Sequence, residues 1–161
     1  MDRIITSFLF LLLAATAMAR DKDTSAIQQA VETKNFIFKA ESATPQRGTM
    51  RQLTPEYEVV LRPDTIISFL PYFGRAFTAP INPSDGGINF TSTRFDYTAR
   101  QKKKNRWEIT VSPKDVTDVT QLYLTVFDNG RASLRVTSTN RESILFDGLV
   151  RPGKPIIKKP F

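Results

Sequence analysis

The chain has 161 residues and contains neither cysteine nor histidine. Without cysteine, a disulfide, a thiol nucleophile, a redox pair and a cysteine-type zinc site are all excluded. Without histidine, the commonest general base at neutral pH and the commonest transition-metal ligand are missing. Ser-His-Asp and Cys-His catalysis are therefore impossible. The enzyme routes that remain are carboxylate pairs, Ser-Lys dyads and metal ions held by oxygen ligands. Because the commonest catalytic and metal-binding side chains are missing, we expect no catalytic residue, no metal site and no cofactor.

A long apolar run is present only at the start of the chain. Arg3 precedes an apolar stretch over residues 4–15, which is followed by Ala17-Met18-Ala19. A charged start, a short apolar core and a small-x-small cleavage site are typical of an export signal. The run is shorter than the roughly 20 apolar residues that span a bilayer. We predict a cleaved signal peptide over residues 1–19 and a periplasmic or secreted protein, which is not a lipoprotein because no cysteine follows the cleavage site.

The net charge of +7 is unevenly distributed. One group of basic residues lies at positions 102–106 and another at positions 151–159, where no acid is present. Charge confined to one turn and one tail is usually solvated, and no nucleic-acid-binding motif accompanies it. We therefore expect no nucleic acid partner. An anionic envelope ligand stays open, as does a peripheral membrane-surface contact by a basic, flexible tail over residues 152–161.

The remainder of the chain reads as a short leader followed by strands. In residues 20–34, Ile27, Ala30 and Val31 recur at helical spacing, which fits a short helix or a frayed leader. Residues 35–151 contain alternating apolar and polar runs separated by turn residues, which predict one β domain. Residues 42–55 are polar and proline-containing, and fit either a long loop or an irregular edge.

The turn at Asp128-Asn129-Gly130 defines one strand pairing. A three-residue loop pairs Val126 with Ala132 and makes one face wholly apolar, whereas a two-residue loop mixes polar and apolar side chains. Because a one-residue slip inverts every side chain, burial selects the three-residue loop. Gly130 is then expected in the left-handed conformation of a bulged turn.

The same argument predicts two further hairpins. A five-residue loop over residues 101–105 pairs Tyr97 with Ile109 and puts the lysines at the tip. In the last hairpin, a five-residue loop pairs Val136 with Phe146 and Arg135 with Asp147.

Consecutive hairpins with a single apolar face describe an up-and-down meander. A sheet of about eight or nine such strands closes on itself or folds over. We therefore predict an all-β fold: an antiparallel up-and-down meander that closes into a small lipocalin- or calycin-like barrel or half-barrel, with a short N-terminal helix.

Four segments resemble a known family. They are Leu70-Pro71-Tyr72-Phe73-Gly74-Arg75-Ala76 and the runs at 87–92, 107–109 and 113–115. On these motifs the chain resembles the domain-of-unknown-function family 4251, exported β proteins of Gram-negative gut bacteria. The resemblance covers about residues 36–150. It implies a periplasmic or outer-membrane-associated protein of calycin-like architecture, and it brings no activity and no catalytic residue.

Five residues are candidates for ligand binding. Tyr72, Phe73 and Arg75 fit an aromatic rim with a guanidinium group for an anion, or alternatively a packed corner. Tyr97 and Trp107 fall on the inner face, where they would either stack on a ligand or fill the core.

The acids near turns also have two interpretations. Asp115, Asp118 and Asp85 could include a glycosidase-like carboxylate pair. Turn chemistry and capping explain the same residues without a catalytic role.

These observations lead to three functional hypotheses. The first is an exported, non-enzymatic envelope protein that binds a small apolar or amphiphilic ligand or a partner protein. The second is a carboxylate-dependent hydrolase acting on envelope glycan. The third is a structural or assembly module of an envelope complex. The sequence leaves open the ligand, the oligomeric state and whether the barrel is filled or hollow.

Overall fold

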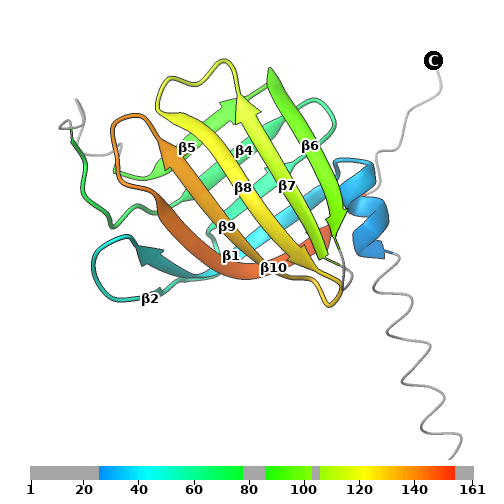
Figure 1. Ribbon diagram of the computed structural model, residues 1–161, viewed down its shortest axis with the longest axis horizontal. Helices are drawn as coiled ribbons and strands as arrows, with labels where there is room; N and C mark the ends of the chain where they lie inside the picture. The colour runs from blue at the N-terminus through cyan, green and yellow to red at the C-terminus, as the bar shows by residue number, and fades with distance from the viewer. Residues whose placement is uncertain (1–25, 78–85, 103–105, 155–161) are drawn as a thin grey trace, which may run out of the picture.

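The computed structural model describes residues 26–77, 86–102 and 106–154. It consists of one short helix over residues 26–32 and ten strands in a single sheet that curls into a barrel (Figure 1). The strands are β1 (Phe36–Pro45), β2 (Arg51–Gln52), β3 (Glu58–Leu61), β4 (Ile66–Leu70), β5 (Ile88–Ser92), β6 (Phe95–Lys102), β7 (Arg106–Pro113), β8 (Val119–Phe127), β9 (Arg131–Ser138) and β10 (Ile144–Pro152). The expected signal peptide, Asp85 and residues 155–161 of the expected tail lie outside the described residues.

The sheet is an antiparallel meander that nearly closes. Its strand order is β5-β4-β3-β1-β10-β9-β8-β7-β6, and β2 pairs with β1 beside this path. Because β1 pairs with β10, the first and the last strand join the two halves of the sheet. The two sheet edges are β5 and β6, which only Thr93 and Arg94 separate in sequence. The predicted all-β barrel is therefore confirmed.

Large apolar side chains fill the inside of the barrel. They alternate with outward-facing residues along each strand, as the period of two requires. The largest of the fully buried side chains are Phe36, Phe38, Leu61, Ile66, Leu70, Ile88, Ile109, Leu122, Leu124, Leu134, Ile144 and Phe146. Each contributes about 1.5–3 kcal/mol by leaving water. The barrel is thus a packed core.

The β8–β9 turn is formed as predicted. Val126 pairs with Ala132 and Leu124 with Leu134. Gly130 has a φ of 79°, so it occupies the left-handed region that favours glycine.

The other two predicted registers are wrong by two residues. Tyr97 pairs with Val111 rather than Ile109, so the β6–β7 connection is the shorter 103–105. Val136 pairs with Ile144 rather than Phe146. Since a shift of two residues leaves every side chain on the same face, burial of one face could not distinguish these registers.

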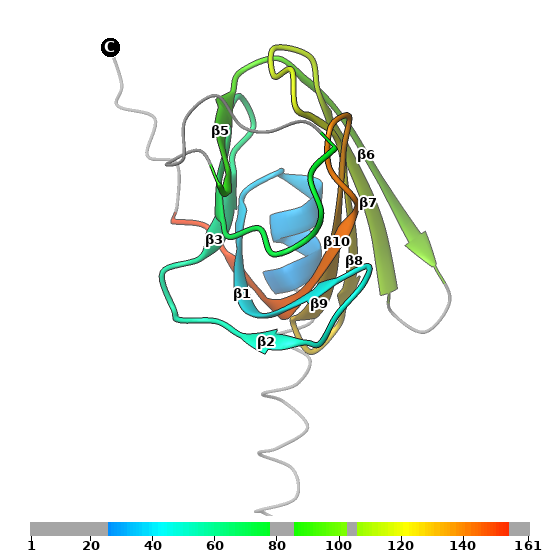
Figure 2. The ribbon, with the colours of Figure 1, turned by 90° about the vertical axis from the view of Figure 1, so that its left-hand side faces the viewer.

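β1 extends into the 42–55 segment, for which the sequence left a long loop or an irregular edge open, and it bends in its middle. The pairing with β10 shifts between Ala40 and Ser42, which marks a bulge, and then continues to Pro45. Opposite the bulge, a Cβ on Gly148 would lie 1.9 Å from the carbonyl oxygen of Lys39, so only glycine fits this close approach. Beyond the bend, β2 and its flanking loops stand away from the barrel wall (Figure 2).

The short helix closes one end of the barrel. Ile27, Ala30 and Val31 are buried in the core, as their spacing predicted. In Figure 2 the helix is seen through the barrel, at its far end. The phenol of Tyr97 on β6 donates a hydrogen bond to the carbonyl of Val31 (2.8 Å), which ties the helix to the sheet.

Candidate functional site: the outer groove and the arginine-rich end

Two of the five candidate ligand-binding residues lie in the packed interior. Trp107 on β7 is only 4% exposed. Tyr97 is partly buried, and burial raises the pKa of its phenol, so the group remains a donor to the helix. The ammonium of Lys34 lies 5.2 Å from the centre of the Tyr97 ring. Both aromatic residues therefore pack in or against the core, and Tyr97 also holds the helix.

The other three candidates lie on residues 71–77, which cross the opposite end of the barrel (Figure 2). The hydroxyl of Tyr72 lies 2.8 Å from the carbonyl oxygen of Arg75 and 2.9 Å from that of Glu142, and its one proton is shared between these two acceptors. Burial, and secondarily the Glu142 carboxylate, raise the pKa of Tyr72. The amide of Phe77 donates to the carbonyl of Asn140 (2.8 Å). Tyr72 thus forms a packed corner with the β9–β10 loop.

Arg141, which the sequence analysis did not single out, holds this end together. Its Nε lies 3.1 Å from Oδ2 of Asp118, and its Nη1 donates to the carbonyl of Gly87 (2.8 Å). Its guanidinium carbon lies 5.2 Å from the centre of the Tyr72 ring. One side chain, 15% exposed, thereby joins the β4–β5 connection, the β7–β8 loop and the β9–β10 loop.

Asp115 caps the bend between the two sheet edges. Its carboxylate accepts hydrogen bonds from the Ser92 hydroxyl and from the amides of Thr93 (3.0 Å) and Arg94 (3.2 Å). The Ser92 hydrogen bond is the main reason that the pKa of Asp115 is lowered to about 2. For Asp115 the capping interpretation therefore fits the contacts, and Asp118 is paired with Arg141.

The outward side of this end is rich in arginine. Arg75 and Arg51 are exposed, and the guanidinium carbon of Arg51 lies 4.7 Å from the centre of the Phe73 ring. The Arg47 side chain is 72% exposed. Two apolar side chains also protrude into solvent, namely Met50, 55% exposed, and Phe77, 67% exposed. We call the five exposed residues Arg47, Met50, Arg51, Arg75 and Phe77 the arginine-rich end.

A groove of about 510 Å³ lies on the outside of the wall, where β1 bends. It is lined by Lys39, Ala40, Glu41, Gln52, Leu53, Pro55, Leu149 and Arg151, and we call it the outer groove. Its side formed by the 52–55 segment is fixed to β1, because the Leu53 amide donates to the Glu41 carbonyl (2.9 Å). The Lys39 ammonium also donates to the carbonyl of Pro55 (3.3 Å).

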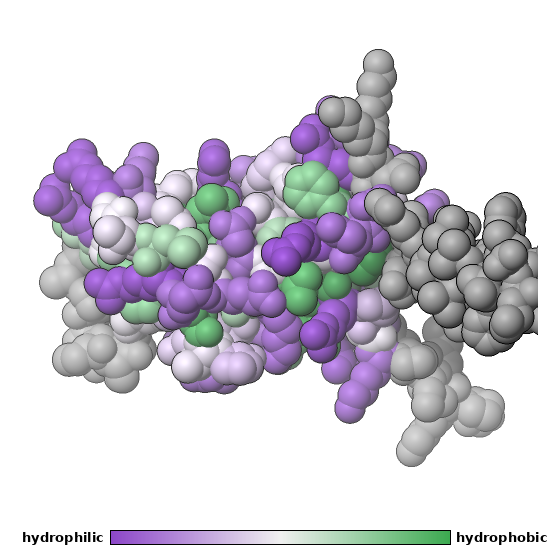
Figure 3. Space-filling view, turned by 90° about the horizontal axis from the view of Figure 1, so that it is seen from below, coloured by the Kyte–Doolittle hydropathy of each residue, from purple (hydrophilic) through white to green (hydrophobic). Residues whose placement is uncertain are grey.

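A second hollow of about 370 Å³ adjoins the outer groove, since Glu41 and Gln52 line both. It extends toward Phe127 and Arg131. Figure 3 views the barrel from below and shows hydrophobic residues between hydrophilic ones on that face.

Charged and apolar side chains alternate where the outer groove meets the second hollow. Arg131 on β9 lies opposite Leu149 on β10, and Arg151 follows Leu149 on the same face. Lys39 is paired with Glu58 on β3. Within the part of the chain that the structure describes, neither Arg131 nor Arg151 takes part in an ion pair. Two guanidinium groups therefore flank an apolar side chain, with the Glu41 carboxylate lining both hollows.

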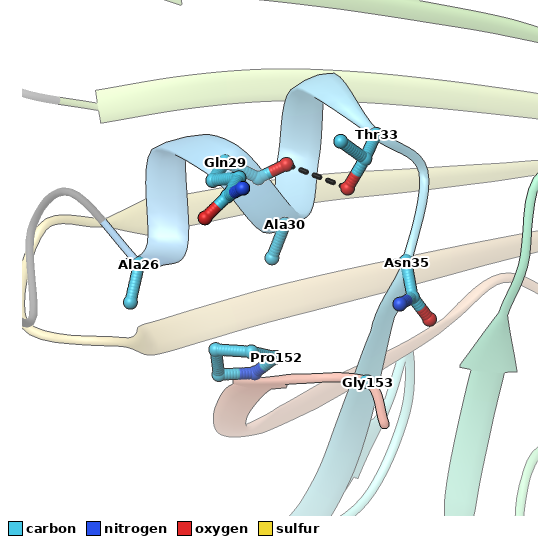
Figure 4. Close-up of a pocket in the computed structure, with 7 residues that line it drawn as sticks. All are labelled: Ala26, Gln29, Ala30, Thr33, Asn35, Pro152 and Gly153. Carbon is cyan, nitrogen blue, oxygen red and sulfur yellow. Dashed lines mark hydrogen bonds between the residues drawn. The ribbon is translucent and has the colours of Figure 1, made fainter. Parts of the chain in front are cut away.

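A further hollow of about 410 Å³ lies between the helix and the end of β10 (Figure 4). Its lining is small and uncharged: Ala26, Gln29, Ala30, Thr33, Asn35, Pro152 and Gly153. The Thr33 hydroxyl is used in a hydrogen bond to the Gln29 carbonyl (2.7 Å). The Asn35 amide donates to the Lys154 carbonyl (3.1 Å). This hollow thus offers a ligand fewer free polar groups than the outer groove does.

Two further kinds of feature are absent from the described ranges. In residues 26–77, 86–102 and 106–154, no group of three or more acidic, histidine or cysteine side chains is arranged to hold a metal ion. Over the same ranges, no helix is long and apolar enough to cross a membrane.

Comparison with known proteins identifies the family. The family model described as Domain of unknown function (DUF4251) matches residues 19–150. The chain belongs to the DUF4251 family. A crystal structure of a DUF4251 protein from Bacteroides eggerthii superimposes with a TM-score of 0.60 at 15% sequence identity, covering 81% of this chain and 87% of that chain. At that identity the likeness shows a shared fold. No curated protein matches the chain.

Proposed function

We propose that this DUF4251 protein is an exported, non-enzymatic envelope protein that binds a small amphiphilic ligand in its outer groove. The observation that carries this proposal is the contrast between a barrel filled by side chains and a groove of about 510 Å³ on its outside. Small-molecule sites typically measure about 300–1,000 Å³ and combine apolar walls with a few polar groups. The pattern of residues 1–19 supports export.

The lining of the groove indicates the chemistry of the ligand. Leu53, Pro55 and Leu149 provide apolar surface for a hydrocarbon chain. Arg151 in the groove and Arg131 in the adjoining hollow provide guanidinium groups, which bind carboxylate or phosphate through paired hydrogen bonds. An anionic headgroup at the arginines, with its chain beside Leu53, satisfies both features.

The proposal differs from a lipocalin-type site in its location. In a lipocalin-like barrel the ligand lies inside, which requires an interior wider than its side chains fill. Here Phe36, Phe38 and Phe146 are fully buried inside the barrel. Binding rather than hydrolysis is favoured because the two described acids considered for catalysis, Asp115 and Asp118, are occupied by a turn and by Arg141.

Isothermal titration with dodecyl phosphate tests this function. We expect saturable binding that Arg151→Gln and Leu149→Asn each weaken by about tenfold, equivalent to about 1.4 kcal/mol. Arg62→Gln and Ile67→Asn are matched controls, because both residues are exposed and lie outside the groove. Absence of binding, or equal loss in the control variants, would contradict the proposal.

A further inference from the structure

Three loops meet at the end of the barrel opposite the helix, and their contacts fix them together. The β1–β2 loop reaches the β9–β10 loop where Nε of Arg47 lies 3.7 Å from Oε1 of Glu142. It reaches the 71–77 segment where Arg51 lies over the ring of Phe73. The amide of Glu142 donates to the carbonyl of Arg75 (3.0 Å), which joins the last two loops. The three segments therefore form one support, on which the five residues of the arginine-rich end are displayed.

The charge of this surface is one-sided. Residues 46–51, 71–77 and 139–142 together contain four arginines and a single acid, Glu142. The Glu142 side chain is only 9% exposed and faces Arg47. Arg141 points to Asp118 and Gly87. Arg47, Arg51 and Arg75 are left as the outward charges, and all three are positive.

Apolar side chains protrude among these arginines. Met50 and Phe77 are the two most exposed large hydrophobic side chains in the described residues. Exposed apolar residues beside a cluster of arginines are the combination by which peripheral proteins bind a membrane surface. The arginines bind lipid phosphates, and the apolar side chains enter the boundary between headgroups and acyl chains.

We propose that the arginine-rich end docks onto an anionic lipid bilayer, with Met50 and Phe77 inserted and Arg47, Arg51 and Arg75 on the phosphates. The charge complementarity selects an anionic surface. The two protruding apolar side chains select a bilayer over a soluble polyanion, which has no apolar layer to receive them. This surface is distinct from the outer groove and from the basic tail, to which the sequence analysis assigned a possible membrane contact.

Sedimentation with phosphatidylglycerol vesicles and with phosphatidylcholine vesicles tests this proposal on the intact protein. We expect binding to the phosphatidylglycerol vesicles that weakens as salt is raised, because salt screens exposed charges. The double variant Arg51→Gln/Arg75→Gln should lower the partition coefficient by roughly tenfold, since each arginine near the surface contributes substantially. The double variant Met50→Ser/Phe77→Ser should lower it by about as much.

Matched variants at the other end serve as controls. Arg62→Gln/Arg100→Gln removes the same charge from two exposed positions, and Phe127→Ser removes an apolar side chain that is 40% exposed. Both should leave vesicle binding within about twofold of the wild type, because neither removes a contact with the bilayer. Truncation after Lys154 should also leave it unchanged.

Four results would overturn the proposal. They are loss of binding on truncation after Lys154, equal losses in the control variants, binding that is unaffected by Met50→Ser/Phe77→Ser, and equal binding to the two kinds of vesicle. If Met50→Ser/Phe77→Ser leaves vesicle binding unaffected and the protein also binds a soluble acidic polysaccharide, the partner is a polyanion rather than a bilayer. Circular dichroism of each variant separates loss of binding from loss of the fold.

Discussion

The two ends of the barrel are closed by different physical means. At one end the helix buries Ile27, Ala30 and Val31, so apolar packing closes the barrel. At the other end residues 71–77 are held by hydrogen bonds and by the guanidinium of Arg141. The apolar packing of the helix does not depend on charge, whereas the closure by residues 71–77 depends on the charge of Arg141. The difference indicates that one end is a structural plug, and that the other end displays charge on a rigid support.

The largest effect is expected at Arg141. Arg141→Ala leaves Asp118 without its cation and the Gly87 carbonyl without its donor. Removing one partner of a largely buried ion pair costs about 3 kcal/mol, so the free energy of unfolding in urea should fall by about that amount. Arg62→Ala, an exposed control near the helix, should change it by less than about 0.5 kcal/mol. Similar values for the two variants would show that the polar closure does not stabilise the fold.

A somewhat smaller loss is expected at the helix end. Ile27→Ala removes apolar volume from a side chain that is 5% exposed. The free energy of unfolding should fall by about 2 kcal/mol. Ile67→Ala, at a position 42% exposed on β4, should cost less than about 1 kcal/mol. Equal costs at the two positions would contradict the packing of the helix into the barrel.

The hydrogen bond from Tyr97 to the helix should contribute less. Tyr97→Phe removes the donor to the Val31 carbonyl and keeps the ring. The loss should be about 1 kcal/mol in the same denaturation assay. Amide hydrogen exchange over residues 26–32 should speed up in this variant. Tyr123→Phe, on the outer face of β8, is the control and should leave that exchange unchanged.

The smallest effect should come from the exposed carboxylate of Asp115, and it depends on pH. The pKa of Asp115 is lowered from 3.8 to about 2 by its hydrogen bonds at the β5–β6 bend. Its contribution is therefore present above about pH 4 and is lost as the pH falls through about 2. The urea midpoint of the wild type should exceed that of Asp115→Asn at neutral pH. A difference that persists unchanged at pH 2 would be inconsistent with this role.

Much of the fold could be predicted from residue pattern. Alternation identified the strands, and the β8–β9 register followed because Gly130 and a wholly apolar face allowed one solution. The β6–β7 and β9–β10 registers were wrong because a shift of two residues preserves each face. The continuation of β1 to Pro45 was not predicted, since the bulge at Ala40 and Ser42 interrupts the alternation.

The candidate sites were less accessible to sequence reasoning. Arg141 acts through contacts from segments that are far apart in the chain, and nothing in its local sequence marks it. The outer groove lies where β1 bends at its bulge and pairs with β2, which brings the 52–55 segment beside it. The arginine-rich end combines loops of which only the 71–77 segment had been singled out. In each case the decisive information is the position of a strand bend or loop rather than residue type.

The central claim is that this protein binds ligand on the outside of a filled barrel, and the single tryptophan tests it directly. Trp107 faces the interior, whereas Gln52 lines the outer groove. A fatty acid brominated along its chain quenches tryptophan fluorescence on contact. We predict that it leaves the emission of Trp107 in the wild type unchanged and quenches the added emission of Gln52→Trp. Quenching of Trp107 with no effect on the residue added at position 52 would contradict the account and place the ligand inside the barrel.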